Sequence, residues 1–130
     1  MNLTAARAAV LAVALAAALL LATATAEARS SETAVVHCGV LVSVHWTLKT
    51  HTGMMSGDRY DVAQQGLTCA QALKLAPALI EQKGGEPGRT LRAPTGFHCL
   101  STVGGNNPNA ISGVCYRSGR HSFSWGPKLR

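Results

Sequence analysis

The sequence predicts an α+β fold: a small antiparallel sheet covered by one kinked helix and held by two disulfides. Three observations support this class: an alternating segment over residues 35–48, a helical pattern that begins at Cys69, and four cysteines in a short chain. Alternation with a period of two indicates a half-buried strand, and recurrence every three or four residues indicates a helix. A sheet with one apolar face needs a second layer, which the helix is expected to supply.

Residues 1–28 have the composition of a secretory signal peptide. Arg7 precedes an unbroken apolar run over residues 8–22, and residues 24–26 and 26–28 both fit the small-x-small cleavage rule. We expect cleavage after Ala28, with Ala26 as the alternative. A membrane anchor is disfavoured, because the run is shorter than the ~20 residues that a spanning helix needs. The predicted organisation is therefore a signal peptide, 1–28, and one secreted disulfide-stabilised domain, 29–130, with no transmembrane segment after cleavage.

The domain is basic. The chain holds 12 Lys and Arg and 6 Asp and Glu, and removal of Arg7 and Glu27 with the signal peptide leaves 11 and 5, a net charge of +6. A basic secreted protein can bind anionic surfaces. The expected partner is an anionic cell-envelope polymer or another secreted protein, and the expected location is the extracellular space or the cell envelope. The basic residues form no dense run, so we expect no specific nucleic-acid partner.

Four cysteines, Cys38, Cys69, Cys99 and Cys115, lie in the predicted domain. An even number in a short exported chain indicates two disulfides. Zinc is disfavoured because the chain has no CxxC or HxxxH pair, so no metal and no cofactor are expected. Four cysteines allow three pairings, which spacing does not distinguish. We favour Cys69–Cys115 with Cys38–Cys99, which would tie the helix to the last hairpin.

The first predicted strand, 35–48, places one set of side chains inward: Val36, Cys38, Val40, Val42, Val44, Trp46 and Leu48. A hairpin turn is expected within 52–58, followed by a short second strand that includes Tyr60, Val62 and Leu67. Thr68 is then the expected N-cap of the helix, because its hydroxyl can accept a hydrogen bond from a free backbone N–H of the first turn.

The helix presents an apolar face made of Cys69, Ala72, Leu73, Ala76 and Ile80. Lys83 suits its C-terminal end, and Gly84-Gly85 is expected to stop it in the left-handed conformation. Pro77 interrupts the backbone hydrogen bonding, so we expect either a kink or a second short helix that starts there. The apolar face stays in phase across the proline, which favours the kink.

The C-terminal part is predicted to form a loop over 86–96, a strand over 97–103, a Gly/Asn/Pro-rich loop over 104–112, and a hairpin with strands 113–116 and 121–125. Two turns fit this hairpin. A two-residue Ser118-Gly119 turn sends Cys115 outward, whereas a three-residue loop with left-handed Gly119 sends Cys115 to the face of Phe123. We favour the second, because a disulfide sulfur belongs on the buried face.

The second half of the chain contains four short motifs: Leu67-Thr68-Cys69-Ala70-Gln71-Ala72, Gly96-Phe97-His98-Cys99, Val114 to Gly119, and Ser122-Phe123-Ser124-Trp125. Together they resemble a group of small secreted cysteine-containing proteins of high-GC Gram-positive bacteria. Tyr116 before Arg117 and Phe97 in place of the usual tryptophan depart mildly from the pattern. The resemblance spans about Leu67 to Trp125. It implies export and disulfides, and implies no catalytic residue, because the group has no assigned activity.

No motif for catalysis is visible. The chain has no GxSxG, its cysteines are expected to be paired, and Asp58 and Asp61 make at most a weak calcium site without further oxygen ligands. The five histidines are interpreted as surface or packing residues, although His98 and His121 could meet across strands: His37, His45, His51, His98 and His121. We therefore expect a protein that is not an enzyme and has no catalytic residues.

Four basic residues near the last hairpin form a possible anion patch: Arg117, Arg120, Lys128 and Arg130. The alternative interpretation is a polar turn and a charged tail that protects a sheet edge. The leading function hypothesis is non-enzymatic binding in the extracellular space or at the cell envelope. The alternative is a secreted protease inhibitor, with 86–94 or 104–112 as the inhibitory loop.

Overall fold

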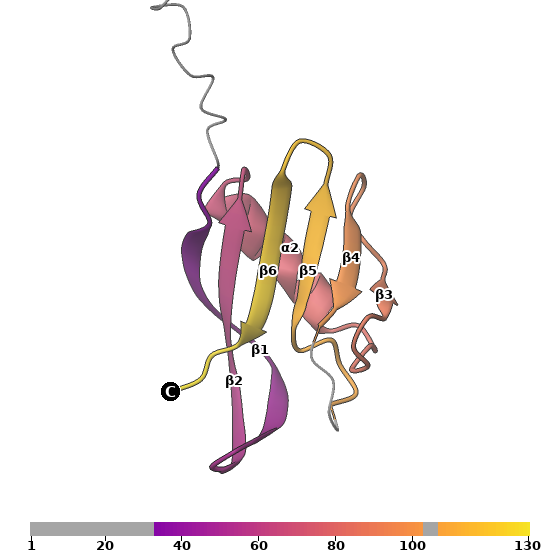
Figure 1. The fold of residues 1–130 in the computed structure, drawn as a ribbon. Coiled ribbons are helices and arrows are strands. Elements are labelled where there is room, and N and C mark those ends of the chain that lie inside the picture. Colours follow the sequence, from indigo (N-terminus) through magenta and orange to yellow (C-terminus); the bar gives the residue numbers. More distant parts are fainter. Residues whose placement is uncertain (1–32, 103–106) are drawn as a thin grey trace, which may run out of the picture. The chain divides into compact units, whose positions relative to one another are not determined.

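The computed structural model describes residues 33–102 and 107–130; the predicted signal peptide, 1–28, lies outside the described residues. Six strands form one antiparallel sheet in the order β1-β2-β6-β5-β4-β3 (Figure 1). The strands are β1 (Val36–Thr50), β2 (Gly53–Gln65), β3 (Thr90–Leu91), β4 (His98–Ser101), β5 (Gly113–Arg117) and β6 (His121–Pro127). The helix of the described part, α2 (Cys69–Ile80), follows β2. The α+β class is confirmed.

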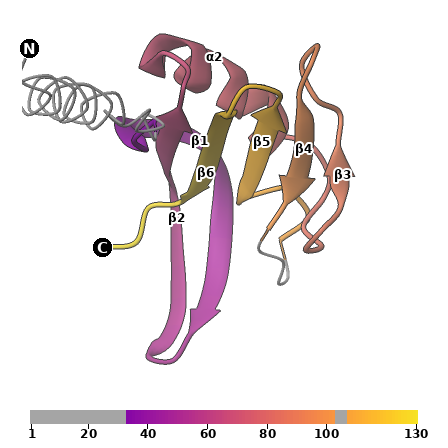
Figure 2. The same ribbon diagram turned by 45° about the horizontal axis from the view of Figure 1, so that its top comes forward.

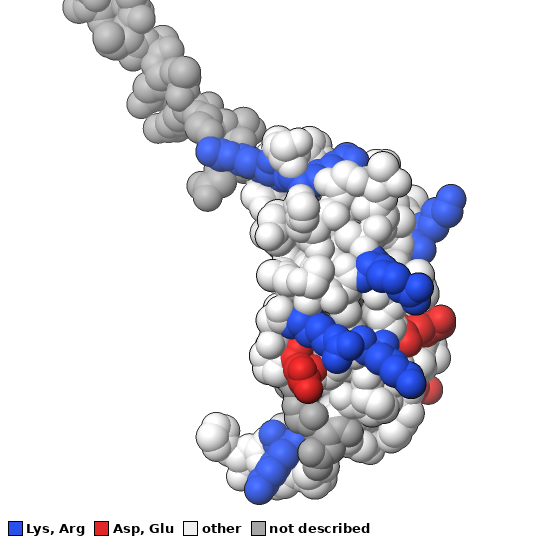
Figure 3. Space-filling model, turned by 90° about the vertical axis from the view of Figure 1, so that its right-hand side faces the viewer, with Lys and Arg blue, Asp and Glu red and all other residues white. Residues whose placement is uncertain are grey.

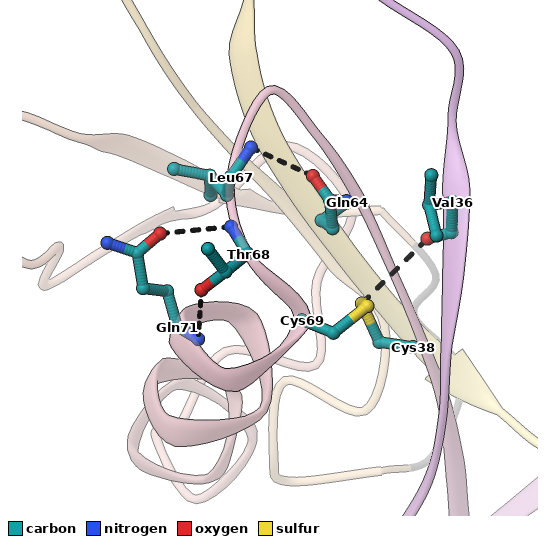
Figure 4. Close-up of a disulfide and its surroundings, with 7 residues drawn as sticks. All are labelled: Val36, Cys38, Gln64, Leu67, Thr68, Cys69 and Gln71. Carbon is teal, nitrogen blue, oxygen red and sulfur yellow. Dashed lines mark hydrogen bonds between the residues drawn. A yellow bond between two sulfur atoms is a disulfide. The ribbon is translucent and has the colours of Figure 1, made fainter.

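The start of α2 follows the prediction. Thr68 is the N-cap, and its hydroxyl accepts a hydrogen bond from the backbone N–H of Gln71 at 3.2 Å. The Gln71 side chain accepts from the Thr68 N–H at 3.0 Å, which completes a capping box (Figure 4). The helix buries Ala72, Ala76, Leu79 and Ile80, and packs on β1, β2 and β6 (Figure 2). Full coverage of one sheet face, and the kink at Pro77, stay predictions.

The predicted helix stop at Gly84-Gly85 is wrong. The helix ends at Ile80, and its C-cap Glu81 keeps right-handed backbone angles. Neither glycine has a positive φ. The two glycines instead allow close packing: a Cβ on Gly85 would lie 1.7 Å from the Asn107 carbonyl oxygen, and one on Gly84 would lie 2.9 Å from Leu91.

The inward set predicted for the first strand is only partly right, because two register shifts interrupt β1. One lies between His37 and Gly39, and the second lies between Val42 and Trp46. Each shift changes which side chains face the core. Trp46 is buried, but three valines of the predicted inward set, Val36, Val40 and Val42, are exposed. Periodicity alone does not reveal a bulge, so the prediction placed all three inward.

Two side-chain hydrogen bonds hold the second irregular segment in place. The Tyr60 hydroxyl donates to the Val44 carbonyl at 2.8 Å, and the Trp46 indole N–H donates to the Arg59 carbonyl at 3.0 Å. A Cβ on Gly57 would come within 2.8 Å of the Trp46 ring, so this position needs glycine. The hairpin turn also lies earlier than predicted, at 51–52, and β2 is a 13-residue strand rather than a short one.

The disulfides are Cys38–Cys69 and Cys99–Cys115, so the favoured pairing was wrong. The β4–β5–β6 meander places Cys99 directly opposite Cys115, a register that the long connection between the two strands hides from the sequence. Cys38 lies in the first β1 bulge and reaches the start of α2 (Figure 4). One disulfide therefore joins the helix to an edge strand, and the other joins two neighbouring strands.

The C-terminal hairpin follows the favoured three-residue loop. Arg117 pairs with His121 and Cys115 pairs with Phe123, and Gly119 has a φ of +79°. The segment that precedes β5 was predicted to be a loop, but part of it packs into the core. Ala110 and Ile111 are fully buried, and the Trp125 indole N–H donates to the Ala110 carbonyl at 2.8 Å.

Candidate binding surfaces

The structure divides the predicted anion patch into two parts. Arg117 ends β5 and Arg120 lies in the turn before β6, whereas Lys128 and Arg130 follow the other end of β6. The seven residues of β6 separate the two pairs by about 20 Å. The four side chains therefore form no single patch. Arg117 has a packing role as well, because its guanidinium carbon lies 4.8 Å from the centre of the Phe97 ring.

Lys128 and Arg130 instead meet Arg59, which the sequence analysis did not single out. The three line a hollow of about 650 Å³ between the end of the β1–β2 hairpin and the C-terminal tail. The Lys128 backbone N–H donates to the Arg59 carbonyl at 2.9 Å, which fixes the tail along β2. Apolar side chains complete the wall of this hollow, which we call the tail hollow: Trp46, Met54, Met55 and Leu129.

Two carboxylates lie near these cations. Asp61 contacts Lys128, with 3.5 Å between Oδ1 and Nζ, and both side chains are substantially exposed. Asp58 also lines the tail hollow, and its charge adds to the effect of burial in raising the pKa of neighbouring Tyr60 to about 12. Arg59 and Arg130 form no ion pair with any residue in 33–102 or 107–130.

A second group of basic residues surrounds β3. Lys83, Arg89 and Arg92 line a hollow of about 620 Å³ together with Glu81. Figure 3 looks onto this side, where lysine and arginine side chains gather with a few acidic ones among them. The sequence signal was available, since Arg89 and Arg92 flank the short β-branched and apolar pair Thr90-Leu91, but the segment was assigned to a loop.

A shallow third hollow, of about 410 Å³, gathers residue types that can form a hydrolase site, including His37, Asp61, Ser112 and Ser124. The hydrogen bonds do not connect them as a nucleophile, base and carboxylate. Asp61 contacts Lys128, and the Ser112 hydroxyl lies 2.7 Å from the Thr102 hydroxyl. The arrangement gives no support for hydrolysis.

The histidines are dispersed over the described part of the chain. The His98 ring stacks near the Tyr116 ring, with 5.8 Å between the centroids, and His121 Nδ1 lies 3.1 Å from the Ser118 carbonyl. His98 and His121 do not meet, because β5 lies between their strands. Within the described ranges, no three His, Cys, Asp or Glu side chains gather as a metal site.

No family model, curated protein or solved structure matches this chain. The resemblance to small secreted cysteine-containing proteins of high-GC Gram-positive bacteria therefore stays a prediction. Of the residues that the structure describes, none belongs to a helix with the length and apolar character needed to span a membrane. Two disulfides indicate an oxidising compartment.

Proposed function

We propose that the protein is an exported, non-enzymatic binding protein that recognises an anionic polymer of the cell envelope or extracellular space through the tail hollow. The observation that carries this proposal is the convergence of Arg59, Lys128 and Arg130 from distant parts of the sequence on one walled hollow. The signal-peptide composition of residues 1–28 and the paired cysteines support export. In the same proposal, α2 covers one sheet face with a kink at Pro77, which leaves the opposite face free.

Charge favours an anionic ligand. The described residues hold ten Lys and Arg against four Asp and Glu, a net charge of +6. Within the tail hollow, three cations face one carboxylate of the lining, Asp58. Arginine is suited to phosphate and carboxylate because its planar group offers paired donors. Two arginines and a lysine that line one hollow can therefore contact successive charges of a polymer.

The hollow is also held in shape. The hydrogen bond from Lys128 N–H to the Arg59 carbonyl fixes the tail, and the Trp46 indole uses the same carbonyl oxygen. Anchored backbone around a binding site lowers the entropy that binding costs. Met54 and Leu129 are exposed beside the cations, so a ligand with apolar groups next to its anions would contact both.

Binding to polyphosphate, used as a simple anionic polymer, tests the site. The double variant R59A/K128A should weaken binding at least about tenfold, since a charge-assisted hydrogen bond is worth about 1.5–3 kcal/mol. The matched control is R117A/R120A, which removes the same charge at the other end of β6 and should change affinity little. Equal losses in the two variants would indicate diffuse attraction without a site. No binding of the wild type to polyphosphate or isolated cell walls would reject the function.

The alternative function, protease inhibition, has one supporting observation. The loop between Glu86 and Thr90 is exposed but held from beneath by Ser101, whose hydroxyl donates to the Glu86 carbonyl. The Gly88 N–H also donates to the Ser101 carbonyl at 2.8 Å. If this loop inhibits proteases, Arg89 suits enzymes that cleave after basic residues, and R89A should abolish inhibition of trypsin. Trypsin that keeps its full rate with excess wild-type protein would exclude this role.

A further inference from the structure

We propose that the uncovered edge of β1, over Gly39–Val42, pairs antiparallel with the same segment of a second copy and joins two sheets into one. β1 is the terminal strand of the sheet and pairs with β2 on one side. An edge strand leaves the backbone N–H and C=O groups of its outer side open to another strand. No side chain in the described ranges hydrogen-bonds to the backbone of 39–42.

Farther along the same edge, the backbone of Thr47 is capped by a side chain. At Thr47, the Asn107 side chain accepts from the backbone N–H at 2.9 Å and donates to the backbone carbonyl at 2.6 Å. Asn107 thus takes the place that a neighbouring strand would occupy, and it is buried as it does so. The stretch of four residues between the two register shifts of β1 has no such cap from the described part of the chain and carries no charged side chain.

The composition of this stretch favours association. Residues 35–48 contain no Asp, Glu, Lys or Arg, in a chain with 18 charged residues. Val40 and Val42 are 42% and 67% exposed. Protected edge strands commonly carry a charged side chain or a proline to prevent pairing, and this segment has neither.

A second copy fits this edge because the stretch complements itself. When a two-fold axis passes beside Leu41, Val40 lies opposite the partner's Val42, and Val42 lies opposite the partner's Val40. Both pairs are apolar and β-branched, and such cross-strand pairs stabilise a sheet. No like charges meet at the axis, although each copy has a net charge of +6. The two copies also have bulges at equivalent places, so their straight stretches have equal length.

Sedimentation of the oxidised protein recovered from a secreting host tests the proposal between about 1 μM and 1 mM, the range of weak to moderate affinities. The variant V42K replaces the Val40–Val42 contact with a lysine opposite the partner's Val40 and brings the two lysines diagonally together across the axis, so it should raise the dimer dissociation constant at least about tenfold. The matched control is M54K, because Met54 is also 67% exposed but lies on β2 near the hairpin turn. This control should leave the dissociation constant within about twofold.

Nuclear magnetic resonance of a mixture of labelled and unlabelled protein tests the register. Contacts between Val40 and Val42 methyl groups of different copies are expected, together with slower amide exchange in 39–42 at high concentration. A monomer at every concentration overturns the proposal, as does a dimer that V42K and M54K weaken equally. Capture of an unrelated extended peptide by this edge in a protein that stays monomeric would also overturn self-pairing.

Discussion

The two edges of the sheet differ in both length and charge. β1 is a 15-residue strand whose first charged residue is Lys49, whereas β3 has two residues and lies between Arg89 and Arg92. A short edge flanked by charges offers little for another strand to pair with. β1 has neither form of protection and instead carries bulges and the Asn107 cap. The short edge is therefore protected by its length and charge, whereas β1 is capped only at Thr47 and stays open over 39–42.

The edges also differ in what holds them to the domain. Cys38–Cys69 ties β1 to the helix, whereas β3 depends on the Ser101 hydrogen bonds and lies two strands from Cys115. The long edge is thus fixed by a covalent bond to another layer, and the short edge is fixed within the sheet.

The largest expected effect comes from breaking that covalent bond. The double variant C38A/C69A opens a loop of 31 residues and should lower the free energy of unfolding by about 4 kcal/mol. Urea denaturation measures the loss, and amide exchange should show faster opening of β1. The control C99A/C115A opens a 16-residue loop, so its chain-entropy loss is about 3 kcal/mol. If β1 amides exchange equally in both variants, the disulfide does not hold the edge.

The next effect concerns Tyr60, which holds the second irregular segment of β1. Its pKa is about 12 in the folded protein and 10.0 is the ordinary value. The unfolded chain therefore loses this proton first, so stability is fully present below pH 10 and falls as pH rises from about 10 to 12. The expected loss is about 2–3 kcal/mol. Denaturation of wild type and Y60F across this range isolates the effect, and parallel curves would contradict it.

A comparable loss is expected when the cap of β1 is removed. The variant N107A leaves the Thr47 N–H and carbonyl without their partner and should cost about 2 kcal/mol of unfolding free energy. It also lengthens the open edge, so the dimer should become tighter. N109A is the control, because the Asn109 side chain donates to the Glu81 carbonyl and has no hydrogen bond to β1 among the described residues. Unchanged dimer affinity in N107A would show that this cap does not limit association.

The smallest effect is expected at the other edge. Replacing both arginines in R89V/R92V should change the free energy of unfolding by less than about 0.5 kcal/mol, because both side chains are exposed. It should create no new dimer in sedimentation, since a two-residue strand is too short to pair stably. Association of this variant would mean that charge, rather than length, protects β3.

Local rules predicted the parts of the fold that local contacts decide. Thr68 as the N-cap, the apolar face of α2 and the three-residue loop at Gly119 were predicted, because each depends on residues a few positions apart. The bulges of β1 could not, because they depend on bonds such as Tyr60 to Val44 across the hairpin. The disulfide pairing depended on which strands are neighbours in the sheet, which spacing does not state.

The candidate site was predicted only in part for the same reason. Lys128 and Arg130 are close in sequence and stay together, but Arg117 and Arg120 lie at the far end of β6. Arg59 joins Lys128 because β2 and β6 are neighbours, although 69 residues separate the two in the chain. The basic composition predicted an anionic ligand. The strand order determines which basic residues lie close enough together to bind it.

The Asn107 cap has a consequence for the order in which the protein folds. The cap joins residues 60 positions apart, so it closes one of the longest loops in the domain, and such contacts form late because ordering the intervening chain costs entropy. Until then the hairpin of β1 and β2 can exist with its whole outer side open. An intermediate of this kind is the species most exposed to aggregation. We therefore expect the yield of refolded protein to fall as protein concentration rises, because a second molecule can then reach the open hairpin before residues 107–111 do.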